Sequence, residues 1–137
     1  MVDEIDEKIL RLLEKNARMT YVDIGREVGL SEGAIRNRVQ SLVENDVIQR
    51  FTIEKSTQVG VRALTMIAVN PGTPTFEISQ KVDELRGVER IYEVTGEYDI
   101  IMVSTGSNIE SINRVIEDIR KIKGVEKTNT IIVLRTI

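Results

Sequence analysis

The sequence predicts an α+β fold in which a small helical domain precedes a domain of alternating strands and helices. Three observations lead to this prediction. Apolar residues recur at the helical period through the first third of the chain, whereas the alternation typical of strands begins near Ile48. The phrase "LRGVERI" at 85–91 returns as "IKGVEKT" at 122–128, which indicates that one structural unit occurs twice within 137 residues.

Three helices are predicted in the N-terminal part. Asp3, Thr20 and Ser31 are good N-cap residues, and each precedes a stretch whose apolar residues are spaced three and four apart. The second helix closes at Gly29, because glycine readily adopts the left-handed conformation that follows a helix. The predicted helices cover residues 4–16, 20–28 and 31–45.

The rest of the chain is predicted to follow the order β-α-β-β-α-β. "VIQRFTI" at 47–53 is interpreted as a connecting strand, and the next strand ends at the Pro71-Gly72 turn. Ser107 and Glu110 have the spacing of a capping box. The order is that of a ferredoxin-like domain, an antiparallel sheet with both helices on one face. The later elements are helices at 75–85 and 108–122 and strands at 88–95, 99–104 and 125–135.

The recurring phrase fits this order. With a shift of 37 positions, the apolar stripe of the first helix matches that of the second, and each helix ends in a basic residue, Gly, Val and Glu. Glycine alone would be ordinary here, because helices commonly end at glycine. The matching stripes around Gly87 and Gly124 favour an internal repeat of a helix, a glycine stop and a strand. The stripes are Ile78, Val82 and Leu85, and Val115, Ile119 and Ile122.

The sheet face without helices is expected to mediate association. Apolar residues around Tyr92 and in the segments 100–103 and 131–134 leave too little polar surface for that face to stay in water. We therefore expect contacts between copies of this domain.

The stretch "TYVDIGREVGLSEGAIRNRV" at 20–39 has the features of a helix-turn-helix. Two helices cross closely in this motif, so one position must be small, the turn favours glycine, and the second helix needs one apolar face. Gly25 and Gly29 meet the first two needs, and the stripe Ile35, Val39, Leu42 meets the third. Glycine inside a helix costs roughly 1 kcal/mol against alanine, so Gly25 indicates close packing.

The outward side of the third helix carries side chains suited to reading DNA. Arginine, asparagine and glutamine form paired hydrogen bonds with guanine and adenine, and a glycine lets the backbone approach the duplex. The alternative is an ordinary solvated helix face. Arg38 projects toward the flank, where a phosphate contact and an ion pair inside the domain are equally open. The candidate DNA-binding residues are Ser31, Gly33, Arg36, Asn37, Arg38, Gln40 and Ser41.

Composition argues against several classes of function. The chain has no histidine and no cysteine, so it lacks the common general base, the commonest transition-metal ligand and any disulfide. We therefore expect no enzyme, no metal site and no cofactor. No run of 18 apolar residues is present, which favours a cytoplasmic protein without membrane spans. Residues 1–50 hold eight Lys or Arg and ten Asp or Glu, which predicts weak non-specific DNA binding.

Over its whole length the sequence resembles the Lrp/AsnC family of feast/famine transcriptional regulators. The resemblance lies in "D-x-K-I-L-x-x-L-x-x-N-A-R-x-T" from Asp6, "I-G-R-E-V-G-L-S-x-x-A-I-x-N-R-V-x-x-L" from Ile24, "V-I-x-R-F-T" from Val47 and "T-G-E-Y-D" from Thr95. It implies a DNA-binding domain, a sensor domain, dimers through the sheet faces, and assembly of dimers into tetramers or octamers. Asp46 departs from the glycine that is common in the family.

A small amino acid is the effector that the resemblance implies, bound between dimers. A glycine turn beside Tyr98 and Asp99 offers N–H donors for a carboxylate and acceptors for an ammonium group. Without the resemblance, a tight hairpin shaped by Asp99 explains the same residues. In the family this turn and a nearby strand lie at the effector site, which implies Gly96, Tyr98, Asp99, Thr128 and Thr130 here.

The sequence is thus interpreted as three segments: a DNA-binding domain at 1–47, a connecting strand or linker at 48–60, and a sensing and oligomerisation domain at 61–137. The predicted function is a sequence-specific regulator that binds double-stranded DNA and responds to an amino acid. The main alternative is an architectural protein of the same fold that wraps DNA with little sequence preference. Two further alternatives are a decarboxylase related to the family and a stand-alone sensor, and the absence of histidine disfavours the decarboxylase.

Overall fold

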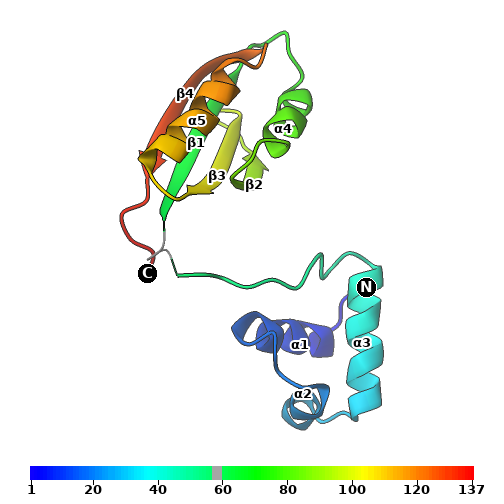
Figure 1. The fold of residues 1–137 in the computed structure, drawn as a ribbon. Helices are drawn as coiled ribbons and strands as arrows, with labels where there is room; N and C mark the ends of the chain where they lie inside the picture. Colours follow the sequence, from blue (N-terminus) through cyan, green and yellow to red (C-terminus); the bar gives the residue numbers. More distant parts are fainter. Residues whose placement is uncertain (57–59) are drawn as a thin grey trace. The chain divides into compact units, whose positions relative to one another are not determined.

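The computed structural model describes residues 1–56 and 60–137, and these form two compact units (Figure 1). The units are Met1–Glu54 and Lys55–Ile137, and each has its own apolar core. Among the residues described, no helix combines the length and apolar character needed to cross a bilayer.

The N-terminal unit consists of the three predicted helices. Their N-caps are as predicted: the side chains of Asp3, Thr20 and Ser31 each accept a hydrogen bond from a backbone N–H of the first turn. Apolar side chains from all three helices, including the fully buried Ile9, Ile24 and Ile35, form the core. The helices are α1 (Glu4–Lys15), α2 (Tyr21–Val28) and α3 (Glu32–Glu44).

The C-terminal unit follows the predicted β-α-β-β-α-β order. Its four strands form one antiparallel sheet in the order β2-β3-β1-β4, and α4 and α5 cover the same face of it (Figure 1). This topology confirms the ferredoxin-like prediction. The elements are β1 (Val61–Val69), α4 (Thr75–Asp83), β2 (Val88–Glu93), β3 (Ile100–Gly106), α5 (Ile109–Arg120) and β4 (Val125–Ile132).

The core of this unit lies between the sheet and the two helices. Ile67 and Ile100 are opposite each other on β1 and β3, and both are fully buried. Ile78 from α4 and Ile119 from α5 pack into the same cluster. The apolar stripes that defined the repeat are therefore the faces that the helices turn toward the sheet.

The helices of the repeat end at Asp83 and Arg120, earlier than the predicted ends at 85 and 122, and each is followed after a three-residue turn by a glycine in the left-handed region. Gly87 has φ +91° and Gly124 has φ +107°, a conformation that residues with a Cβ adopt only at a cost. A Cβ on Gly124 would also lie 2.8 Å from the side chain of Thr73. The recurring glycine therefore serves both the turn into the strand and close packing.

The other face of the sheet is apolar, as predicted. Cross-strand register places Leu64 beside Val103 and Ile131, and Met66 beside Ile101. Ile131 and Tyr92, which faces Ile101, remain 49% and 46% exposed. A row of half-buried and exposed apolar side chains thus runs across all four strands, and no helix among the described residues of the unit covers it.

Two local predictions are wrong. No strand pairing is present in residues 48–56 of the connecting strand, because an extended segment becomes a strand only when a neighbouring chain segment supplies hydrogen bonds. Residues 57–59 of the same prediction lie outside the described residues. The capping box of α5 is formed by Asn108 and Ser111 instead of Ser107 and Glu110. The helix begins at Ile109, so Asn108 occupies the N-cap position, where its Oδ1 accepts from the Ser111 N–H at 2.9 Å.

Candidate functional sites

The turn between α2 and α3 is built around the carbonyl group of Gly25. This oxygen accepts hydrogen bonds from the N–H groups of Gly29 and Leu30, at 2.8 and 3.0 Å. A Cβ on Gly25 would lie only 2.4 Å from the Leu30 carbonyl oxygen. The close crossing that the sequence predicted at Gly25 is therefore present, and it fixes where α3 begins.

Helix α3 has one buried and one exposed side. Ile35, Val39 and Leu42 are buried in or against the core of the N-terminal unit. The opposite side carries most of the candidate reading residues, which are all exposed and therefore free to meet a DNA groove. They are Ser31, Gly33, Arg36, Asn37, Gln40 and Ser41.

Acidic residues of the same helix hold two of these side chains. The guanidinium of Arg36 pairs with Glu32 one turn earlier, and Nε2 of Gln40 donates to Oε1 of Glu44 at 2.9 Å. The Arg36–Glu32 ion pair and the Gln40–Glu44 hydrogen bond are both exposed, and such exposed contacts contribute little to stability, so a base edge can displace them. Ser31 is committed to the Ala34 N–H as the N-cap of α3, which leaves Gly33, Arg36, Asn37, Gln40 and Ser41 on the outward face.

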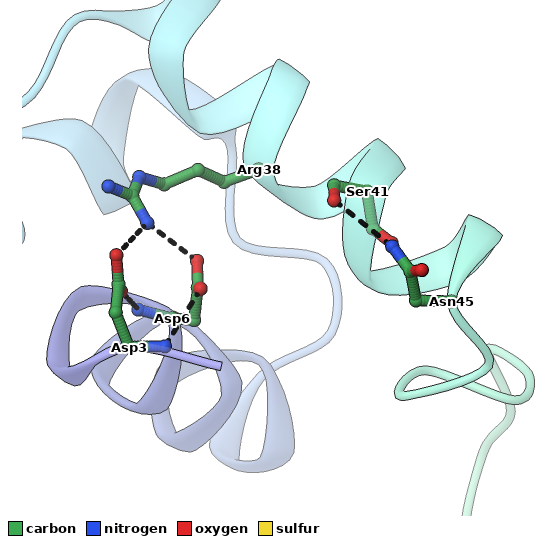
Figure 2. Close-up of polar contacts among 5 residues, drawn as sticks. All are labelled: Asp3, Asp6, Arg38, Ser41 and Asn45. Carbon is green, nitrogen blue, oxygen red and sulfur yellow. Dashed lines mark hydrogen bonds and ion pairs between the residues drawn. The ribbon is translucent and has the colours of Figure 1, made fainter. Parts of the chain in front are cut away.

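Arg38 lies at the flank of α3 and pairs with two aspartates of α1. Its Nη1 is 2.7 Å from Oδ2 of Asp3 and 2.8 Å from Oδ1 of Asp6 (Figure 2). The Asp6 N–H and this guanidinium together lower the pKa of Asp3 below its ordinary value of 3.8. The two carboxylates in turn raise the pKa of Arg38. Of the two roles left open for Arg38, the structure contains the ion pair.

Figure 2 also shows how α3 ends. Nδ2 of Asn45 donates to the Ser41 carbonyl at 2.8 Å and lies 3.3 Å from the Ser41 hydroxyl. The next residue, Asp46, has φ +57°, so it supplies the left-handed turn for which a glycine would be the easier choice. Ser41 therefore lies on the outward face of α3 and is also in contact with the C-cap residue of its own helix.

The candidate effector turn joins β2 to β3, and Asp99 shapes it. Oδ2 of Asp99 accepts from the Val69 N–H at 2.7 Å, and the Asp99 N–H donates to the Ile67 carbonyl at 2.9 Å. The Val94 N–H donates to the Asp99 carbonyl at 2.9 Å, which closes the turn. Asp99 thus ties the turn to the end of β1, as the hairpin interpretation of this residue requires.

Tyr98 meets a residue that the sequence did not single out. Nζ of Lys127 lies 5.2 Å from the centre of the Tyr98 ring and 2.9 Å from Oε1 of Glu97. This arrangement places a cation beside the turn, where it can pair with a carboxylate. The sequence repeat marks this position, since Lys127 corresponds to Arg90 in the first copy of the repeat. Gly96, with φ +116°, has open space around its Cα.

The two threonines lie on β4, on the helix-covered side of the sheet. Thr128 is opposite Ile67, so it flanks the same end of β1 as Asp99. Thr130 lies two residues further along β4, opposite Thr65, and the two threonine hydroxyls are 3.0 Å apart. The fold thus brings Tyr98, Asp99 and Thr128 to one end of the sheet, whereas Thr130 is engaged in a contact between strands.

Comparisons with known proteins cover both units. A family model described as the AsnC-type helix-turn-helix domain matches residues 2–43, and one described as the Lrp/AsnC ligand binding domain matches residues 62–137. Two relatives named HTH-type transcriptional regulator LysM, from Sulfurisphaera tokodaii and Saccharolobus solfataricus, are 50% and 49% identical. The alignments span 98% of this chain and 96% and 95% of theirs.

Solved structures agree with the fold. Escherichia coli AsnC is similar with a TM-score of 0.79 and 26% identity, over 99% of this chain and 94% of that one. A feast or famine regulatory protein from Mycobacterium tuberculosis, complexed with L-methionine, has a TM-score of 0.87, 24% identity and the same coverage. The chain has a helix-turn-helix DNA-binding domain and a ligand-binding domain, and it belongs to the Lrp/AsnC family of transcriptional regulators.

Proposed function

We propose that this regulator reads a specific, two-fold symmetric DNA site with the outward face of α3, and that a free amino acid bound by the C-terminal domain changes its assembly or its affinity for DNA. The main support for the DNA-reading part of the proposal is the set of side chains on the outward face of α3. Arg36, Asn37 and Gln40 are exposed side by side on a helix whose other side is buried. These side chains are those that distinguish bases in the major groove.

Symmetry in the DNA site follows if the protein acts as a dimer. The apolar face of the sheet supports a dimer of C-terminal domains, because it would cover Leu64, Tyr92 and Ile131. Two copies of α3 would then enter successive major grooves about one helical turn apart. We propose further assembly of dimers into tetramers or octamers, and action in the cytoplasm, where the DNA of a prokaryotic cell lies.

An amino acid is the proposed effector for two reasons. The chain has the ligand-binding domain of the family, and similar structures include proteins complexed with L-methionine. Lys127 of β4 places a cation beside the β2–β3 turn, and Asp99 of the turn carries a carboxylate, so the two are complementary to the two charges of an amino acid. The proposed effector residues are Gly96, Tyr98, Asp99, Thr128 and Thr130.

Selection from a random duplex library tests the DNA half of the proposal. The purified protein would be incubated with the library at fixed salt, and bound duplexes would be amplified and sequenced. Enrichment of a palindromic motif with half-sites about one helical turn apart is the expected result. Retention of all sequences alike would instead favour the architectural function, in which DNA is wrapped with little preference.

The effector half is tested by the mass of the assembly. Each of the twenty common amino acids would be added, and the oligomer mass measured by light scattering. One amino acid is expected to shift the mass of the wild-type protein. Asp99→Asn retains an acceptor for the Val69 N–H and removes the charge, so this variant should keep the dimer and lose most of the shift. An unchanged shift would remove Asp99 from the site.

A further inference from the structure

Arg38 differs from Arg36, the other arginine of α3, because its partners lie at the N-terminus of another helix, α1. We propose that Arg38 is a positioning residue that fixes α3 to the first turn of α1 through Asp3 and Asp6, and that it makes no contact with DNA. The proposal rests on the proposed function, since it assumes that α3 reads DNA. It changes the role of a residue that the sequence placed among the DNA-binding candidates.

The two carboxylates divide their oxygens between two tasks. Oδ1 of Asp3 accepts from the Asp6 N–H at 2.8 Å, and Oδ2 of Asp6 accepts from the Asp3 N–H at 3.1 Å. These bonds form the capping box of α1. The remaining oxygen of each carboxylate faces Nη1 of Arg38 (Figure 2). The guanidinium therefore pairs with the carboxylate oxygens that the capping box leaves free, and these oxygens hold the guanidinium in place.

Burial makes this link costly to break. The Asp6 side chain is only 11% exposed and that of Arg38 is 31% exposed, whereas Arg36 is 62% exposed. If Arg38 turned toward a phosphate, Asp6 would lose its cation and remain a buried charge, which is strongly unfavourable. Two carboxylates around one guanidinium also leave a net negative charge there, and this charge repels a phosphate.

The link lies directly beside residues of the reading face. A hollow of about 320 Å³ is lined by Asp6 and Arg38 together with Asn37, Ser41 and Asn45. Paired contacts with base edges require side chains to be held within about 0.5 Å of their productive positions. An α3 released from α1 would still approach the phosphates, but it would present Asn37 and Ser41 less accurately. Discrimination between sequences should suffer more than affinity for DNA in general.

The test compares binding of full-length variants to two duplexes over a range of salt concentrations. The first duplex is the one enriched in the selection experiment, and the second has random sequence. The variants are Arg38→Gln, Asp6→Asn and their combination, with Arg38→Lys as the conservative replacement. Arg11→Gln, which removes an exposed arginine from α1, is the matched control.

We expect Arg38→Gln and Asp6→Asn each to lower the ratio of specific to random affinity on the order of tenfold. The combined variant should be no worse than the poorer single one, because both changes break the same link. Arg38→Lys should restore part of the ratio. The slope of log affinity against log salt should stay that of the wild type, as no phosphate contact is lost.

Other results would overturn the proposal. If Arg38 contacts a phosphate, Arg38→Gln should reduce the salt slope by about one ion per subunit, and Asp6→Asn should strengthen binding to both duplexes. Unaltered discrimination in Arg38→Gln would overturn it too. A wild-type protein that does not discriminate at all would overturn the proposed function itself, and the wild-type measurement alone reveals this case.

A milder variant distinguishes the loss of positioning from a folding defect. Asp3→Asn keeps an N-cap acceptor for the Asp6 N–H and removes only the charge that faces Arg38. Helical circular dichroism and hydrogen exchange in α1 and α3 would establish that this variant is folded. A folded Asp3→Asn protein with reduced discrimination supports the positioning role, and one with full discrimination contradicts it.

Discussion

Two acidic residues, Glu32 and Glu44, hold the side chains that we assign to DNA reading. Before DNA binds, Arg36 pairs with Glu32 and Gln40 donates to Glu44. A base or phosphate must replace these partners, and each glutamate then adds a negative charge near the duplex. Only contacts with the correct bases offset the lost contacts with the glutamates and the repulsion between these glutamates and the duplex. The acidic neighbours therefore favour discrimination over general affinity, at the scale of single residues.

Asp3 gives the N-terminal unit a measurable dependence on pH. The Asp6 N–H and Arg38 lower the pKa of Asp3 in the folded protein below 3.8. The stability that Asp3 contributes is therefore fully present above about pH 4 and is lost as the pH falls through its folded pKa. Asp3→Asn has no such group, so its stability should fall less between about pH 4 and pH 2 than that of the wild type.

Hydrogen exchange in α1, measured at several acidic pH values, checks this expectation. Arg38→Gln should lie between the wild type and Asp3→Asn, because it removes the guanidinium and keeps the N–H of Asp6 as a donor. Parallel pH profiles for all three proteins would show that the contact of Asp3 with Arg38 does not stabilise the fold.

Among the elements, Gly25 and Gly33 of the helix-turn-helix have opposite roles. Gly33 has open space around its Cα, so Gly33→Ala should stabilise α3 by up to about 1 kcal/mol through helix propensity. Gly25→Ala meets the Leu30 carbonyl at 2.4 Å and must displace the turn, so it should destabilise the unit by about 1 kcal/mol. Thermal unfolding followed by helical circular dichroism compares them. A stabilising Gly25→Ala would contradict the close crossing at this turn.

The elements were largely predictable, because their signals are local. N-cap residues and apolar spacing located all three helices of the first unit, and the repeat located both helices of the second. The cap of α5 was misplaced by one residue, since Ser107 and Asn108 are both suitable caps in sequence. The prediction of a connecting strand was wrong for residues 48–56, because strand pairing depends on a neighbouring chain segment that the sequence of these residues does not specify.

Of the candidate site residues, only those on the outward face of α3 could be placed from the sequence. Helical geometry placed Arg36, Asn37 and Gln40 outward without knowledge of any neighbour. The partners of Arg38 lie 32 and 35 positions away, and no spacing rule connects them. Lys127 meets Tyr98 only because β4 and the β2–β3 turn lie at the same end of the sheet. The contacts of Arg38 and Lys127 therefore depend on tertiary structure, which local sequence patterns do not reveal.

At the scale of the whole molecule, charge limits how this regulator binds DNA. The chain carries 19 Lys or Arg and 22 Asp or Glu, so general attraction to DNA is weak. Few phosphate contacts per subunit imply a shallow dependence of affinity on salt, below about ten released ions per dimer. Titrations of a random duplex at several salt concentrations give this slope. A slope of ten ions or more would contradict the charge argument.

Sequence reading by the outward face of α3 is measured by the ratio of affinities for the selected duplex and a random duplex at one salt concentration. We expect a ratio of about 10³ or more for the wild type. Arg36→Ala/Asn37→Ala should lose most of that ratio, since each paired contact with a base contributes about 1–3 kcal/mol. Arg11→Ala should retain it. A wild-type ratio near one, or a full ratio in the double variant, would show that the outward face of α3 does not read DNA.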